Sequence, residues 1–165
     1  MRLLSSIIVA LFFLNGLAMA TDPQTKSFTA DPKIQTIAEA YAQNAVDFAR
    51  KQFGIQLDWT DASIANVETA LAKMHQSYIS TTPRPTEKQV MSFAYAFGSY
   101  IGEVYRRNHG GEWGIVDLEG QKYPGIKSKS GTNFWPWGRA LNRIIQGPEN
   151  NVADYYKMLL EKQKP

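Results

Sequence analysis

The apolar residues of this chain follow a helical period over most of its length. From Pro32 to Gln52 they recur at three- and four-residue steps, and Asp31 just before them is a typical helix N-cap. The segment from about 60 to 78 keeps this spacing more strictly and ends before a proline-containing loop. The period returns in two shorter segments, at about 136–147 and 151–162. Each of these four segments is predicted to form an amphipathic helix.

A fifth helical segment, at about 87–108, differs from the others because both of its sides can be covered. Large apolar residues line one face, and small residues together with the carboxylate of Glu103 line the other. Gly98 and Gly102 widen the small side, and each costs roughly 1 kcal/mol in helix propensity that close packing must offset. This pattern places the segment at the centre of the fold, packed tightly against another element.

After Gly110-Gly111 the period changes from helical to extended. Two short runs flank a four-residue turn that ends at Gly120, so an antiparallel hairpin is predicted at about 113–126. The polar segment 127–132 has no period and is predicted to be a mobile loop. The expected fold class is therefore α+β, mainly α, with about five helices packed around the 87–108 helix and one short antiparallel hairpin.

Residues 1–20 are predicted to be a signal peptide. One basic residue precedes an apolar run that is shorter than the roughly 20 residues a membrane helix needs, and Ala18-Met19-Ala20 fits a signal peptidase site. We expect cleavage after Ala20, a periplasmic or secreted protein, and no membrane span once the signal peptide is removed. Residues 21–30 then form a polar lead, and residues 31–165 form a single globular domain.

Charge and composition exclude several classes of protein. After cleavage the chain would keep 17 of its 18 Lys and Arg residues against 15 Asp and Glu residues, a net charge of +2 that is scattered rather than gathered on one face. Nucleic acid is therefore not an expected partner. With two histidines and no cysteine, the sequence contains no metal-binding motif and cannot form a disulfide. We expect neither a metal nor another cofactor.

Glu103 is the sharpest candidate for chemistry, and two interpretations of it are open. Arg106 and Arg107 follow it by three and four residues, so it can form ion pairs on its own helix. Alternatively, its carboxylate lies in a pocket with Trp113 and the segment 134–137, where a raised pKa would make it a catalytic general acid or base. Glycoside hydrolysis would need a second carboxylate, and the spacing of the others singles out none.

An aromatic and basic group of residues is the candidate binding surface. The aromatic segment 134–137 directly follows the polar, basic segment 127–132 and opens a helix, so not every ring can face the core. Trp and Arg dominate binding hot spots, which favours an interaction site here. The candidate binding residues are Trp113, Tyr123, Lys127, Lys129, Trp135, Trp137 and Arg139.

The pattern GxYxGEV at 98–104, followed by GGxW at 110–113, carries a resemblance to a known family. Over about residues 55–145 the chain resembles a bacterial family of small helical domains of unknown function. The resemblance implies a small helical domain and no established activity. By analogy alone, the general look of the chain is also similar to immunity proteins that neutralise toxins delivered by neighbouring bacteria.

Three functions remain open from the sequence. The first is an exported, non-enzymatic binding or inhibitor-type protein that acts through its aromatic and basic surface on another envelope protein or a cell-wall glycan. The second is a cell-wall glycan or peptide hydrolase that uses Glu103 as general acid or base. The third is a structural or stress protein of the envelope without a discrete site. Because the sequence contains no recognisable catalytic motif, it favours the first.

Overall fold

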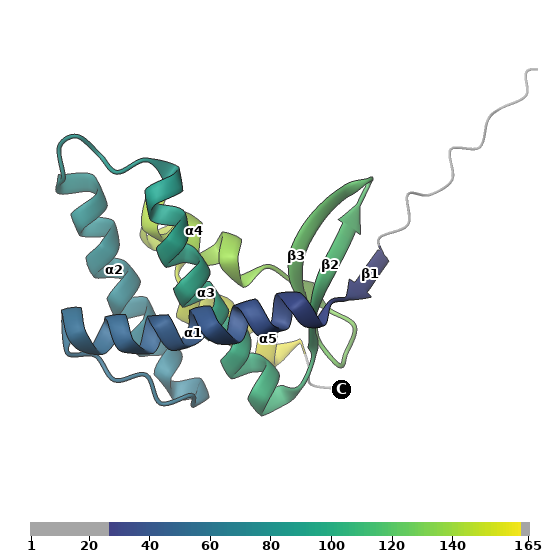
Figure 1. The fold of residues 1–165 in the computed structure, drawn as a ribbon. Helices are drawn as coiled ribbons and strands as arrows, with labels where there is room; N and C mark the ends of the chain where they lie inside the picture. The colour runs from purple at the N-terminus through teal and green to yellow at the C-terminus, as the bar shows by residue number, and fades with distance from the viewer. Residues whose placement is uncertain (1–26, 163–165) are drawn as a thin grey trace, which may run out of the picture.

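The computed structural model describes residues 27–162, so the predicted signal peptide at 1–20 lies outside the described residues. Within 27–162, five α-helices lie beside one antiparallel sheet of four strands, and Figure 1 shows the sheet at one end of the helical part. The fold is therefore α+β and mainly helical. In chain order the elements are β1 (Ser27–Ala30), α1 (Pro32–Phe53), η1 (Asp61–Ser63), α2 (Ile64–Ser80), α3 (Glu87–His109), β2 (Glu112–Leu118), β3 (Gln121–Lys127), β4 (Asn133–Phe134), α4 (Pro136–Ile145), η2 (Pro148–Asn150) and α5 (Val152–Glu161).

The five predicted helices are present close to their predicted limits, because local signals fix their ends. The side chain of Asp31 accepts a hydrogen bond from the backbone N–H of Lys33 at 2.9 Å and so begins α1. Thr86 and Gln89 form a reciprocal capping box that begins α3. None of the helices within 27–162 is long and apolar enough to cross a bilayer.

The sheet is larger than the single hairpin predicted from the sequence. β2 and β3 form that hairpin, but β1 pairs antiparallel with the free edge of β2, and β4 adds a two-residue strand to β3. Residues 27–30, assigned above to the polar lead, are thus part of the fold. Four residues with one large apolar side chain give no alternating pattern, so β1 is defined by its partner strand rather than by its own sequence.

The α3 helix lies at the centre of the molecule, as its two covered faces predicted. A Cβ added at Gly98 would come within 2.7 Å of the backbone of Pro136 and Trp137, so this glycine lets α4 approach. A Cβ at Gly102 would overlap the ring of Trp113. The two glycines therefore bring α4 and the sheet against α3, and the packing offsets their low helix propensity.

The sheet has two faces with different surroundings. Side chains on its inner face, including Trp113, Ile126 and Phe134, belong to the main hydrophobic core together with α3 and α4. Side chains alternate along a strand, so the residues between them point to the opposite, outer face. Val116 points there. It is fully buried, yet it is not part of the main core, which means that other side chains cover the outer face.

Candidate functional site

The carboxylate of Glu103 is fully buried and is held by three side chains. Its Oε1 accepts hydrogen bonds from Arg106 Nε at 2.9 Å and from the indole N–H of Trp113 at 2.8 Å. Its Oε2 accepts from a terminal guanidinium nitrogen of Arg106 at 2.9 Å and from Arg107 Nε at 3.1 Å. The ion pairs with Arg106 and Arg107 are thus present, and of the alternative only the contact with Trp113 is seen.

These contacts determine the charge of Glu103. Burial would raise its pKa, but the hydrogen bonds from Arg106 and Trp113 and the positive charge of Arg106 outweigh burial and hold the pKa below its usual value. A general acid at neutral pH needs the opposite shift. The four accepted hydrogen bonds also use the lone pairs that a substrate would approach. The catalytic role of Glu103 stays a prediction, and the geometry favours a carboxylate that joins α3 to β2.

Two of the candidate binding residues lie inside the fold rather than on its surface. Trp113 is buried under α3, where its ring packs against Trp137 with the ring centres 5.4 Å apart. Trp137 is half-buried, and its indole N–H donates to the hydroxyl of Ser99 at 2.7 Å. The sequence places both rings in the aromatic and basic group of candidate binding residues, and Trp137 lies just after the polar loop. The structure places them in the core because Gly102 and Ser99 leave space for them on α3.

The other aromatic candidates lie on the outer face of the sheet. Gly114 of β2 and Gly125 of β3 are directly paired, which leaves a strip of this face without side chains. The ring of Phe28 lies against Gly114, and the indole of Trp135 lies against Gly125. A Cβ at Gly125 would come 3.2 Å from the Trp135 ring. The paired glycines therefore let two half-buried aromatic rings approach the backbone of the sheet closely.

Two further predicted residues share this outer face. Tyr123 and Lys127 alternate with the inner-facing Ile126 along β3, so they point to the same side as Gly125. Tyr123 is 45% exposed. The ammonium of Lys127 lies 5.8 Å from the ring centre of Phe28. We call the surface made by Phe28, Tyr123, Lys127 and Trp135 the aromatic face.

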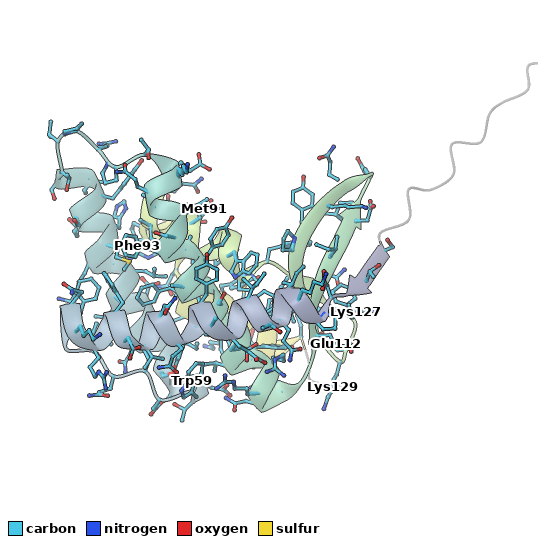
Figure 2. The ribbon with its side chains drawn as sticks, in the orientation of Figure 1. Trp59, Met91, Phe93, Glu112, Lys127 and Lys129 are labelled. Atoms are coloured by element: carbon cyan, nitrogen blue, oxygen red, sulfur yellow. The ribbon has the colours of Figure 1, made fainter. Side chains whose placement is uncertain are left out.

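A cleft opens at one end of the aromatic face, beside the base of the hairpin. It has a volume of about 610 Å³ and is lined by Phe28, Glu112, Lys127 and Lys129, among others. Figure 2 shows Glu112, Lys127 and Lys129 close together there. The stem of Lys129 lies over Gly110, which has no side chain to hold it away. This basic cleft brings the two predicted lysines together, and Glu112 also lines it.

A second cleft, of about 430 Å³, opens beside the other end of the aromatic face. Trp135, Arg139 and Tyr155 line it. The guanidinium of Arg139 lies over the ring of Tyr155, 4.4 Å from its centre, and donates a long hydrogen bond to Asn150 at 3.4 Å. Burial raises the pKa of Tyr155. The hydrogen bond with the backbone of Trp135 and the charge of Arg139 lower it, but burial outweighs them. This aromatic cleft contains Arg139, the last of the predicted binding residues to be placed.

Five of the seven predicted binding residues therefore lie on one continuous surface, formed by the aromatic face and its two clefts. Phe28 connects the face to the basic cleft, and Trp135 connects it to the aromatic cleft. Sequence reasoning missed Phe28 and Glu112. The sequence signal that could have indicated Phe28 is weak: it is the single aromatic residue of the polar lead at 21–30. Within 27–162, no group of three or more acidic or histidine side chains is arranged to hold a metal ion.

Comparison with known proteins adds information about the fold. No family model matches the chain, and no curated protein matches it. A crystal structure at 1.50 Å resolution from Bacteroides thetaiotaomicron VPI-5482 is similar, with a TM-score of 0.58 and 10% sequence identity. The match covers 84% of this chain and 49% of that one, so the chain spans about half the length of its structural relative. At this identity the likeness shows a shared fold alone.

Proposed function

We propose that the protein is an exported, non-enzymatic binding protein of the cell envelope, and that its ligand is a cell-wall glycan held on the aromatic face. The observation that carries the proposal is the glycine pair Gly114–Gly125, against which the rings of Phe28 and Trp135 pack. Half-buried rings held against a rigid sheet present apolar surface without the entropy cost of ordering it on binding.

The surroundings of the rings support a polar, partly anionic ligand. Lys127 and Lys129 are exposed beside Phe28, while Tyr123 adds a hydroxyl to an aromatic ring on the same face. A sugar ring has an apolar face that can stack on an aromatic ring and a rim of hydroxyls that needs hydrogen bonds. Bacterial wall polymers also carry carboxylates, which match the two lysines. The predicted export would bring the protein to this material.

The first experiment is co-sedimentation of the purified protein with cell-wall sacculi. Tyr123→Ala and Lys127→Glu change exposed side chains of the aromatic face, so they leave the core intact and are expected to weaken binding about tenfold, or about 1.4 kcal/mol. Lys122→Glu is the matched control, because Lys122 is exposed on the same strand and points to the opposite face of the sheet. It should bind as the wild type does.

Two results of the sedimentation would contradict the proposal. If all three variants bind as tightly as the wild type, the glycan site lies elsewhere. If the wild type does not sediment with sacculi, a wall glycan is excluded as the ligand. A photo-crosslinker at Tyr123 that captures a single envelope protein, without binding to sacculi, would keep the aromatic face as the site and overturn the glycan as its ligand.

A further inference from the structure

A separate hollow lies in the helical part of the molecule, between α1, α2 and α3, with Ile144 of α4 in its wall. Its volume is about 430 Å³, within the range of small-molecule sites. Most of its lining is apolar, and Phe48, Phe53, Met74 and Phe93 contribute large side chains. None of its residues belongs to the aromatic face or to the two clefts beside it.

The hollow exists because α1 packs closely on α3, whereas α2 does not. A row of fully buried alanines on α1, at 38, 42, 45 and 49, lets that helix lie close along α3. The α2 helix packs mainly on α4 and α5 and touches α3 little. Figure 1 shows α2 and α3 both descending from the loop that joins them, with α1 crossing in front. The space between them is therefore a groove with three helical walls.

The groove exposes apolar surface that the fold leaves uncovered. Phe93 is 37% exposed although it packs on Phe48 with the ring centres 5.0 Å apart. Figure 2 shows Phe93 on α3 in this region. Val90, one turn earlier on α3, lines the same groove and is almost fully buried. Exposed aromatic surface inside a concave site indicates an apolar ligand group.

The charged residues at the groove indicate which head group the ligand carries. Lys73 is the one charged residue among the residues that line it, and no carboxylate lines it. Within residues 27–162, Lys73 forms no ion pair. Arg84, in the loop above, lies 5.8 Å from the ring centre of Tyr78, which also lines the groove. The mouth of an apolar groove is thus positively charged, which suits an anionic head group.

We propose that this groove binds a medium-chain fatty acid, with the alkyl chain against Phe48, Phe93 and Ile144 and the carboxylate beside Lys73. The volume suits a single chain rather than a protein helix, because helix-binding grooves extend over several turns. The lysine stem packs along the wall while its ammonium stays in water. The site is independent of the glycan site on the aromatic face, so either can fail without the other.

The test uses the full chain expressed with its own N-terminus and purified in the form that the cells retain, with the first residue determined by mass spectrometry. Binding of dansylundecanoic acid is followed by fluorescence, and dodecanoate and dodecyltrimethylammonium are used as competitors. Ser77→Trp fills the groove from an exposed position on α2 and should weaken probe binding at least tenfold. Gln76→Trp, exposed on the same helix outside the groove, should leave binding unchanged.

The head-group contact has its own variant. Lys73→Glu should weaken binding of dodecanoate about threefold and strengthen that of dodecyltrimethylammonium by a similar factor. Lys157→Glu on α5 is the charge-matched control. Absence of saturable probe binding to the wild type, or equal binding by Ser77→Trp, would overturn the proposal. So would a wild type that sediments as a dimer and a Ser77→Trp variant that sediments as a monomer, because the groove would then be covered by a second copy.

Discussion

At the scale of single residues, Glu103 shows how burial and charge together decide what a carboxylate can do. It is enclosed at the middle of the molecule, where an isolated negative charge would be costly, and Arg106, Arg107 and Trp113 supply its hydrogen bonds. Arg106 also donates to Glu39 of α1 at 3.0 Å. Glu103 and Arg106 on α3 together thereby connect this helix to α1 and β2. The spacing of the arginines indicated these pairs, but the Trp113 contact depends on tertiary structure.

Glu103→Gln is expected to lower the free energy of unfolding by about 3 kcal/mol at pH 7, because it removes a buried charge and leaves its cationic partners incompletely paired. Unfolding in urea, followed by circular dichroism, measures the change. Glu87→Gln, at the exposed start of the same helix, should cost less than about 1 kcal/mol. Equal effects of the two substitutions would show that the Glu103 network contributes no special stability.

The same variant has a distinct pH profile. The folded-state pKa of Glu103 lies below its unfolded value of about 4.3, so its contribution is fully present above that value and is lost as the pH falls through the folded pKa. Wild-type stability should therefore decrease below pH about 4 more steeply than that of Glu103→Gln. Parallel acid profiles would contradict the lowered pKa.

At the scale of elements, helices could be predicted from the sequence and the sheet only in part. A helix such as α1 carries its own period and cap, whereas β1 exists because β2 offers an unpaired edge. The aromatic face could not be predicted from the sequence, because it too depends on strand pairing. The pairing of Gly114 with Gly125 follows from strand register, and the position of Phe28 over it depends on β1. Patterns along the chain cannot show such cross-strand neighbours before the pairing is known.

The close contact between α3 and the sheet can be tested with two glycines. Gly102→Ala should destabilise the protein by about 1–3 kcal/mol, because the added Cβ would overlap the Trp113 ring in a packed core. Gly138→Ala, in α4, meets no atom within 4 Å of its Cβ and should stabilise the protein by up to about 1 kcal/mol. Thermal unfolding of both variants gives the comparison. A neutral Gly102→Ala would mean that α3 and β2 are less tightly packed than described.

At the scale of the whole molecule, the two proposed ligand sites lie on different parts of the fold. The sheet presents the aromatic face with its basic and aromatic clefts, and the helices enclose the groove beside Lys73. The core between them contains Glu103, Trp113 and the small residues of α3. The fold thus uses its buried carboxylate to hold the sheet in place, and it leaves the outer side of that sheet available for binding.

The central claim is that a cell-wall glycan binds to the aromatic face, and an amide chemical-shift map tests it most directly. On titration with a soluble peptidoglycan fragment, saturable shifts are expected at Gly114, Gly125 and Lys127 and at the indole N–H of Trp135. The indole N–H of Trp113, buried on the inner face, should change little. Shifts confined to the helices, or no saturable shifts at millimolar fragment, would contradict the claim.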